Sequence, residues 1–123
     1  MPDQIPPEIQ DGTLYIRILE EDSVRTLSLV GELDLANAET LAAQLEQAAV
    51  GELVLDMSEL EFIDSTGIAL LVATHRRLND GVVRFRLISS ASPAVQRVMA
   101  LTGLDAELPF SDDGHLKADA GAA

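Results

Sequence analysis

Apolar and polar positions alternate along two stretches near the amino terminus. In residues 13–22, Leu14, Ile16 and Ile18 occupy alternate positions, and residues 23–35 repeat the pattern. A period of two is typical of strands that bury one face. The acidic segment EEDS between the two stretches predicts a hairpin turn that joins them.

Further along, helical spacing alternates with apolar runs. Residues 36–50 predict a helix with Asn37 as a candidate cap, and ELVLDMS predicts a strand covered on both faces. A second helix is predicted after the segment LEFIDSTG, and VVRFRLISS alternates again as a strand. The segment ASPAVQRVMALTG predicts a third helix, after which DAELPF could add a short strand. The predicted order is β-β-α-β-α-β-α, an α/β fold with helices packed against the sheet. We expect a single domain over residues 13–110, with residues 1–12 and 111–123 as flexible tails.

Composition narrows the classes of partner and site. The formal net charge is −13 and the chain contains no cysteine. Such a charge repels nucleic acid and anionic lipid, so any charged partner should present a basic face. The amino terminus lacks the features of a signal peptide and the longest apolar stretch is too short to span a bilayer, so we expect a cytoplasmic protein without membrane contacts.

The segment LEFIDSTGIALL places Asp64, Ser65, Thr66 and Gly67 between a strand and a helix. Ser65 could be the helix N-cap, with Asp64 favourable near the positive end of the helix dipole and Gly67 allowing a tight turn. A hydroxyl at this place could equally be modified by another protein. These residues alone leave both interpretations open.

Enzymatic interpretations find little support in the residues. IDSTG lacks the first glycine of a nucleophile elbow, and His75 follows Ser65 by nearly three helical turns. Asp34, Asp56 and Asp64 could in principle hold Mg²⁺, but caps and surface charges explain them more simply. Lys117, the only lysine, lies in the expected tail, so a P-loop or a receiver site has no lysine. We expect no catalytic activity, no metal site and no cofactor.

A phosphate on Ser65 would have a specific physical consequence. It would add about −1.5 to −2 charges at pH 7. The helix N-terminus tolerates an anion, so the fold need not change, whereas a partner fitted to a neutral serine would meet a dianion.

Three segments carry a resemblance to a known family: GELDLANAETL, LVLDMSELEFIDSTGIALL and ALTGLDAELPF, in this order. The chain resembles STAS domains, and among them the anti-sigma factor antagonists, over about residues 13–110. The resemblance implies a STAS-like fold with a mixed sheet of four to five strands, in a regulator without catalytic activity of its own.

The resemblance also implies roles for individual residues. Ser65 matches the serine that an anti-sigma factor with serine/threonine kinase activity phosphorylates. The unphosphorylated antagonist binds this kinase and releases the sigma factor, and a PP2C-type phosphatase resets the switch. Asp64 and Gly67 would shape the loop, Asp34 would lie at the partner-binding surface, and Thr66 could be a secondary phosphorylation site.

Two other functions fit a STAS domain. The chain could be a stand-alone subunit docked on a membrane transporter, or a scaffold subunit of a stress-sensing complex. A retained hydroxyl inside an acidic loop favours the kinase-bound antagonist, because a purely structural subunit needs no modifiable serine.

Overall fold

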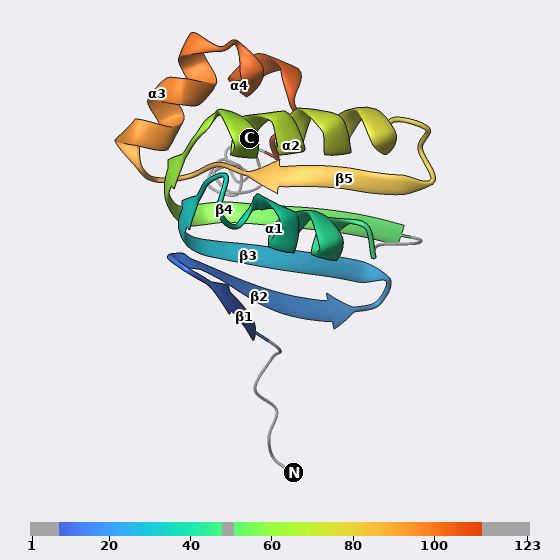
Figure 1. The fold of residues 1–123 in the computed structure, drawn as a ribbon. Helices are drawn as coiled ribbons and strands as arrows, with labels where there is room; N and C mark the ends of the chain where they lie inside the picture. Colours follow the sequence, from blue (N-terminus) through green and yellow to red (C-terminus); the bar gives the residue numbers. More distant parts are fainter. Residues whose placement is uncertain (1–7, 48–50, 112–123) are drawn as a thin grey trace, which may run out of the picture.

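The computed structural model describes residues 8–47 and 51–111, which form one five-stranded sheet with helices on its face and edge (Figure 1). In chain order, the elements are β1 (Glu8–Asp11), β2 (Leu14–Glu21), β3 (Val24–Leu33), α1 (Ala38–Leu45), β4 (Gly51–Ile63), α2 (Ser65–Arg77), β5 (Val83–Ile88), α3 (Pro93–Leu101) and α4 (Leu104–Glu107). The predicted α/β class and mixed sheet are confirmed.

The strands lie side by side in the order in which they occur along the chain, β1-β2-β3-β4-β5. β1, β2 and β3 pair antiparallel, whereas β4 is parallel to β3 and β5 is parallel to β4. The predicted hairpin turn joins β2 to β3: Glu21 pairs with Val24, and Asp22 and Ser23 between them both have positive φ. Positive φ at both central residues gives the backbone twist that a two-residue hairpin requires.

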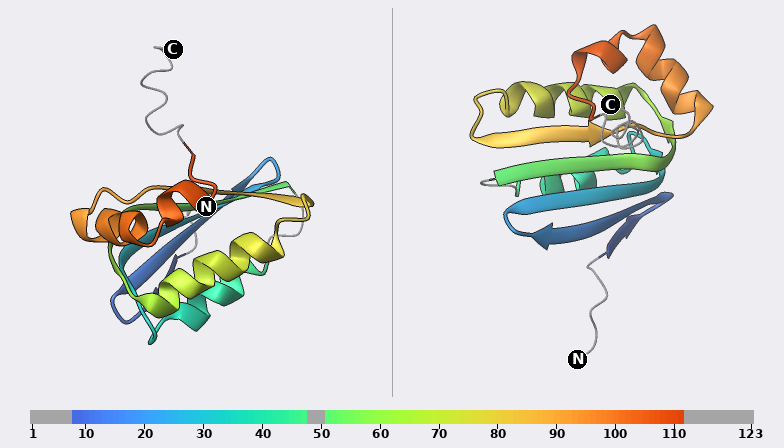
Figure 2. Two further views of the ribbon diagram at one scale, coloured as in Figure 1. Left: turned by 90° about the horizontal axis from the view of Figure 1, so that it is seen from above. Right: turned by 180° about the vertical axis from the view of Figure 1, so that it is seen from behind.

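One face of the sheet carries α1 and α2, and α3 and α4 lie at the β5 edge (Figures 1 and 2). The core between the sheet and the helices is aliphatic. Leu14 and Ile16 of β2, Leu27 of β3 and Leu41 of α1 are completely buried in it. Val54 points away from this core but is only 4% exposed, which confirms that the centre of β4 is covered on both faces.

Both ends of the domain differ from the prediction. Residues 8–11 are not part of a flexible lead-in, since they form β1 and pair with residues 14–17 of β2. The sheet therefore begins before residue 13. DAELPF is not a strand: α4 takes its first residues, and only Phe110 forms an isolated bridge, with Leu87 of β5. Ser111 belongs to the same contact, because its backbone N–H donates to Leu87 at 2.7 Å. Residues 1–7 and 112–123 of the predicted tails lie outside the described residues.

The second half of β4 separates from β5 and is held by other contacts. Ser28 pairs with Asp56 but Val30 pairs with Glu59, so β4 carries an extra residue relative to β3. Pairing with β5 ends at Asp56. Past this point the buried Ser90 hydroxyl donates to the Leu60 carbonyl at 2.6 Å. A bulge re-aims the strand that carries it, and here the Ser90 contact holds the strand end from which α2 begins.

Candidate functional site

The junction between β4 and α2 is organised by Asp64. Its Oδ1 accepts hydrogen bonds from the backbone N–H groups of Thr66 at 2.9 Å and Gly67 at 3.0 Å. Asp64 is therefore the N-cap of α2, and Ser65 is the first helical residue. The expectation that Ser65 could be the cap is wrong, because the carboxylate one position earlier already accepts from the amides that a cap would serve.

Ser65 has no structural task that the described residues reveal. Its side chain is exposed, and no described residue makes a hydrogen bond with its hydroxyl. Thr66 is half-buried at the second helical position, and its backbone contact is to Asp64. Helix capping, the structural role that could have accounted for Ser65, is therefore carried out by Asp64. The Ser65 hydroxyl is available to a partner.

Asp64 also ties α2 to the loop between β3 and α1. Its Oδ2 accepts from the Leu35 N–H at 3.1 Å, and its own N–H donates to the Leu33 carbonyl at 3.1 Å. Because β3 and β4 are parallel neighbours, their carboxyl ends meet at one edge of the sheet. The structure thereby places the loop that contains Asp34 beside the loop that contains Ser65.

Asp34 is half-buried at the start of its loop, where its Oδ1 accepts from the Ala36 N–H at 3.1 Å. This local contact is an Asx turn. Its carboxylate makes no ion pair within residues 8–47 and 51–111, so a partner can approach it.

Asn37 is a site residue whose role was misjudged from the sequence. It stands at the N-cap position of α1, but its side chain makes no capping hydrogen bond. Its Oδ1 accepts from the Asp34 N–H at 2.9 Å, and its Nδ2 donates to the carbonyls of Glu32 at 3.1 Å and Asp11 at 3.4 Å. The side chain is 1% exposed and closes the loop against the end of β1. In the sequence, the only indication that Asn37 has a structural role is its place as a polar residue at the start of a helix.

Position 67 requires glycine because there is no room for a side chain, and not because of the backbone conformation. A Cβ atom there would lie 2.7 Å from Cγ1 of Ile63 and 2.9 Å from Cγ of Leu33. The first turn of α2 therefore packs directly on the ends of β3 and β4. This close approach supports the expected role of Gly67 in shaping the loop.

The surface around Ser65 combines acids with exposed apolar side chains. Leu35, in the β3–α1 loop, is 74% exposed, and Phe62, near the end of β4, is 44% exposed. Glu32, Glu59 and Glu61 are also exposed along these strand ends. Exposed apolar side chains rimmed by charge are typical of a protein-binding surface.

The acids considered for Mg²⁺ do not form a metal site in the part of the chain that the structure describes. Within residues 8–47 and 51–111 no group of three or more His, Cys, Asp or Glu is placed to hold a metal ion. Asp56 instead accepts from the Ser58 N–H at 2.9 Å. None of the helices in these ranges is long and apolar enough to cross a membrane.

Replacing Asp64 with Ala should lower the free energy of unfolding by about 1–2 kcal/mol, because it removes the N-cap and the link to the Leu35 N–H. Asp64→Asn, which keeps an acceptor oxygen, should lose less than half as much. Urea unfolding of both variants measures the difference. Equal losses for Ala and Asn would show that the capping hydrogen bonds contribute little.

Comparisons with known proteins agree with the fold. Residues 15–116 match the STAS domain family. The chain is similar to the anti-sigma-F factor antagonist RsfB of Mycobacterium tuberculosis, with 29% identity over 96 residues, which cover 76% of this chain and 77% of RsfB. It is also similar to the crystal structure of an anti-sigma factor antagonist from Mycobacterium paratuberculosis, with a TM-score of 0.69 and 29% identity over 85% of this chain and 92% of that one.

A second similar structure is that of the Bacillus cell fate determinant SpoIIAA in its phosphorylated form. It has a TM-score of 0.60 and 25% identity, over 78% of this chain and 88% of that one.

Proposed function

The chain belongs to the STAS domain family, and from this premise we propose that it is an anti-sigma factor antagonist whose binding is switched by phosphorylation of Ser65. It acts in the cytoplasm by binding and carries out no reaction itself. The observation that carries the proposal is the exposed Ser65 hydroxyl, which is left without a structural partner in the described residues because Asp64 caps the helix.

The unphosphorylated form is the one that binds. Its partner is an anti-sigma factor that is also a serine/threonine kinase, and binding releases the sigma factor. The names of the similar proteins support the class of partner. Leu35 and Phe62 offer apolar contact area, and the acids around them would pair with basic groups at the rim of the partner surface, while the part of the partner that meets Ser65 is fitted to a neutral hydroxyl.

Phosphorylation ends binding through charge. A phosphate on Ser65 would stand next to Asp64 and beside the loop of Asp34, adding about −1.5 to −2 charges to a surface that is already acidic. The amides of Thr66 and Gly67 already donate to Asp64, so the phosphate faces the partner and gains little from the helix. A PP2C-type phosphatase restores the binding form.

Mass analysis of the protein from its native cells tests the proposal. We expect partial occupancy of one phosphate, which peptide mapping of residues 60–78 places on Ser65. A Ser65→Ala chromosomal variant should lack it, and a Thr66→Ala variant should keep it. Absence of phosphate on Ser65 under several growth conditions would contradict the switch.

Asp34→Ala should weaken binding of the anti-sigma factor about tenfold while lowering the free energy of unfolding by less than about 1 kcal/mol, because its carboxylate accepts one local hydrogen bond. Calorimetric titration and urea unfolding measure the two effects. Glu21→Ala, which removes an exposed acid at the opposite end of the sheet beside the β2–β3 turn, is a control that should change neither. A loss of stability above about 2 kcal/mol would instead make Asp34 a structural residue.

A further inference from the structure

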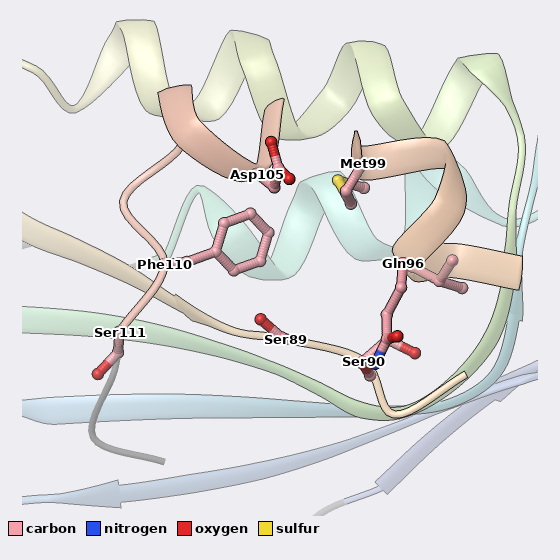
Figure 3. Close-up of a pocket in the computed structure, with 8 residues that line it drawn as sticks. Ser89, Ser90, Gln96, Met99, Asp105, Phe110 and Ser111 are labelled. Carbon is pink, nitrogen blue, oxygen red and sulfur yellow. Dashed lines mark hydrogen bonds between the residues drawn. The ribbon is translucent and has the colours of Figure 1, made fainter. Parts of the chain in front are cut away.

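A cavity of about 310 Å³ lies where the end of β5 meets α3, α4 and the segment around Phe110 (Figure 3). None of the residues assigned above to the switch lines it. In open α/β sheets, small ligands bind outside the carboxyl ends of the strands, and this cavity lies outside the carboxyl end of β5. Its volume is at the lower end of the range for small-molecule sites.

The wall of the cavity is divided into an apolar and a polar part. Val95 and Met99 of α3 and the ring of Phe110 form the apolar part. In Figure 3 the Phe110 ring extends into the cavity from the segment after α4, and Met99 reaches it from α3. An aliphatic group of a few carbon atoms would find contacts on these side chains.

The polar part of the wall offers acceptors. The Nε2 of Gln96 donates to the Ser90 carbonyl at 2.9 Å, so the Gln96 group left for a ligand is its carboxamide oxygen. Asp105 contributes a carboxylate and Ser89 a hydroxyl, and neither side chain has a hydrogen-bonding partner within residues 8–47 and 51–111. All three residues are exposed, so a ligand that donates hydrogen bonds would replace water at these acceptors.

The charge of the residues that line the cavity favours one sign of charge on the ligand. Asp105 is the only ionisable residue among those that line the cavity in the described ranges. Arg86 lies next to the cavity, where its Nη1 donates to the hydroxyl of the lining residue Ser111 at 2.8 Å, but its charge is paired with Glu52. The chain as a whole carries −13. An anionic ligand would meet repulsion, whereas a cation gains attraction from Asp105 and from the face of the Phe110 ring.

We propose that this cavity binds a small organic cation of the primary alkylammonium class. The ammonium group donates to the carboxylate of Asp105, and the Gln96 and Ser89 oxygens line the same cavity as further acceptors. The alkyl chain packs against Val95, Met99 and Phe110. This site is independent of the proposed switch and does not require Ser65 to be modified.

Titration of the full-length protein with n-butylammonium chloride, followed by ¹H–¹⁵N chemical shifts, tests the proposal. We expect saturable shifts at the amides of Ser89, Gln96 and Phe110, with a dissociation constant of about millimolar because the probe has few atoms. Sodium butyrate, with the opposite charge, and ammonium chloride, without the alkyl chain, should give no saturable shift at these amides.

Two variants of α4 with the same change of charge separate the cavity from general attraction of cations. Asp105→Asn should raise the dissociation constant about three- to fivefold, because the lost carboxylate is exposed and partly screened. Glu107→Gln removes an exposed acid that does not line the cavity, and should change it less than about 1.5-fold. Equal effects of the two variants, equal shifts with butyrate, or shifts confined to the acidic surface around Ser65 would overturn the proposal.

Discussion

Ser65→Asp is expected to lower the affinity for the cognate anti-sigma factor at least about 100-fold, which corresponds to about 2.7 kcal/mol. Ser65 is exposed next to Asp64, and Leu35 and Phe62 are exposed at the neighbouring strand ends, so a partner that covers this surface removes water from it. A carboxylate buried there without a positive partner costs several kcal/mol. Phosphate carries more charge than aspartate, so the variant gives a lower limit for the switch.

The fold of the Ser65→Asp variant should be unaffected, because Asp64 already accepts from the amides of the first turn and the new carboxylate faces solvent. Ser65→Asn, which has nearly the same shape without the charge, is the matched control and should lose less than about fivefold in affinity. Calorimetric titration of both variants with the anti-sigma factor measures the effect. If Asp and Asn bind alike, the switch does not act through charge.

Gly67→Val should lower the free energy of unfolding by about 3 kcal/mol or more. The first added carbon would already lie within 3.0 Å of Ile63 and Leu33, and valine adds two methyl groups to the same space. Relief requires α2 to move away from the ends of β3 and β4, because neither buried side chain can leave the core. The same displacement moves Ser65, so binding of the anti-sigma factor should fall with stability.

Ala69→Val is the matched control for this loss. Ala69 is exposed in the same helix, so its replacement tests the cost of a β-branched residue without the steric contact. That cost should be about 0.5 kcal/mol. Urea unfolding of the two variants measures both. A Gly67→Val variant that loses no more stability than Ala69→Val would show that the strand ends adjust freely.

The parts of the fold that the sequence predicted correctly are those with a clear period. Leu14, Ile16 and Ile18 alternate without interruption, and the structure buries all three. The short elements could not be predicted in this way. β1 has four residues and follows two prolines, and DAELPF fits a helical turn as well as a strand. Pairing with β2 decides the first case, in which Glu8 and Arg17 are only nine residues apart. The bridge to Leu87, which lies 23 residues before Phe110, decides the second.

At the candidate site, too, the sequence does not show which atoms make which contacts. Asp64 and Ser65 are both good capping residues, and a helix start shifted by one residue exchanges their roles. Asn37 looked like a cap because it precedes a helix, but its side chain binds backbone groups that reach from Asp11 to Asp34. That role depends on β1, whose existence the sequence did not predict.

The strands have the same order in the sheet as in the chain, and this has a consequence for folding during synthesis in the cell. Each strand from β2 to β5 pairs with the strand that precedes it in the chain. A growing chain can therefore dock each new strand on one that has already left the ribosome, beginning with the β2–β3 hairpin, and no strand must wait for a distant partner. The segment with Ser65 follows β4 directly, so the proposed phosphorylation site reaches its place only after four of the five strands, β1 to β4, have been synthesised.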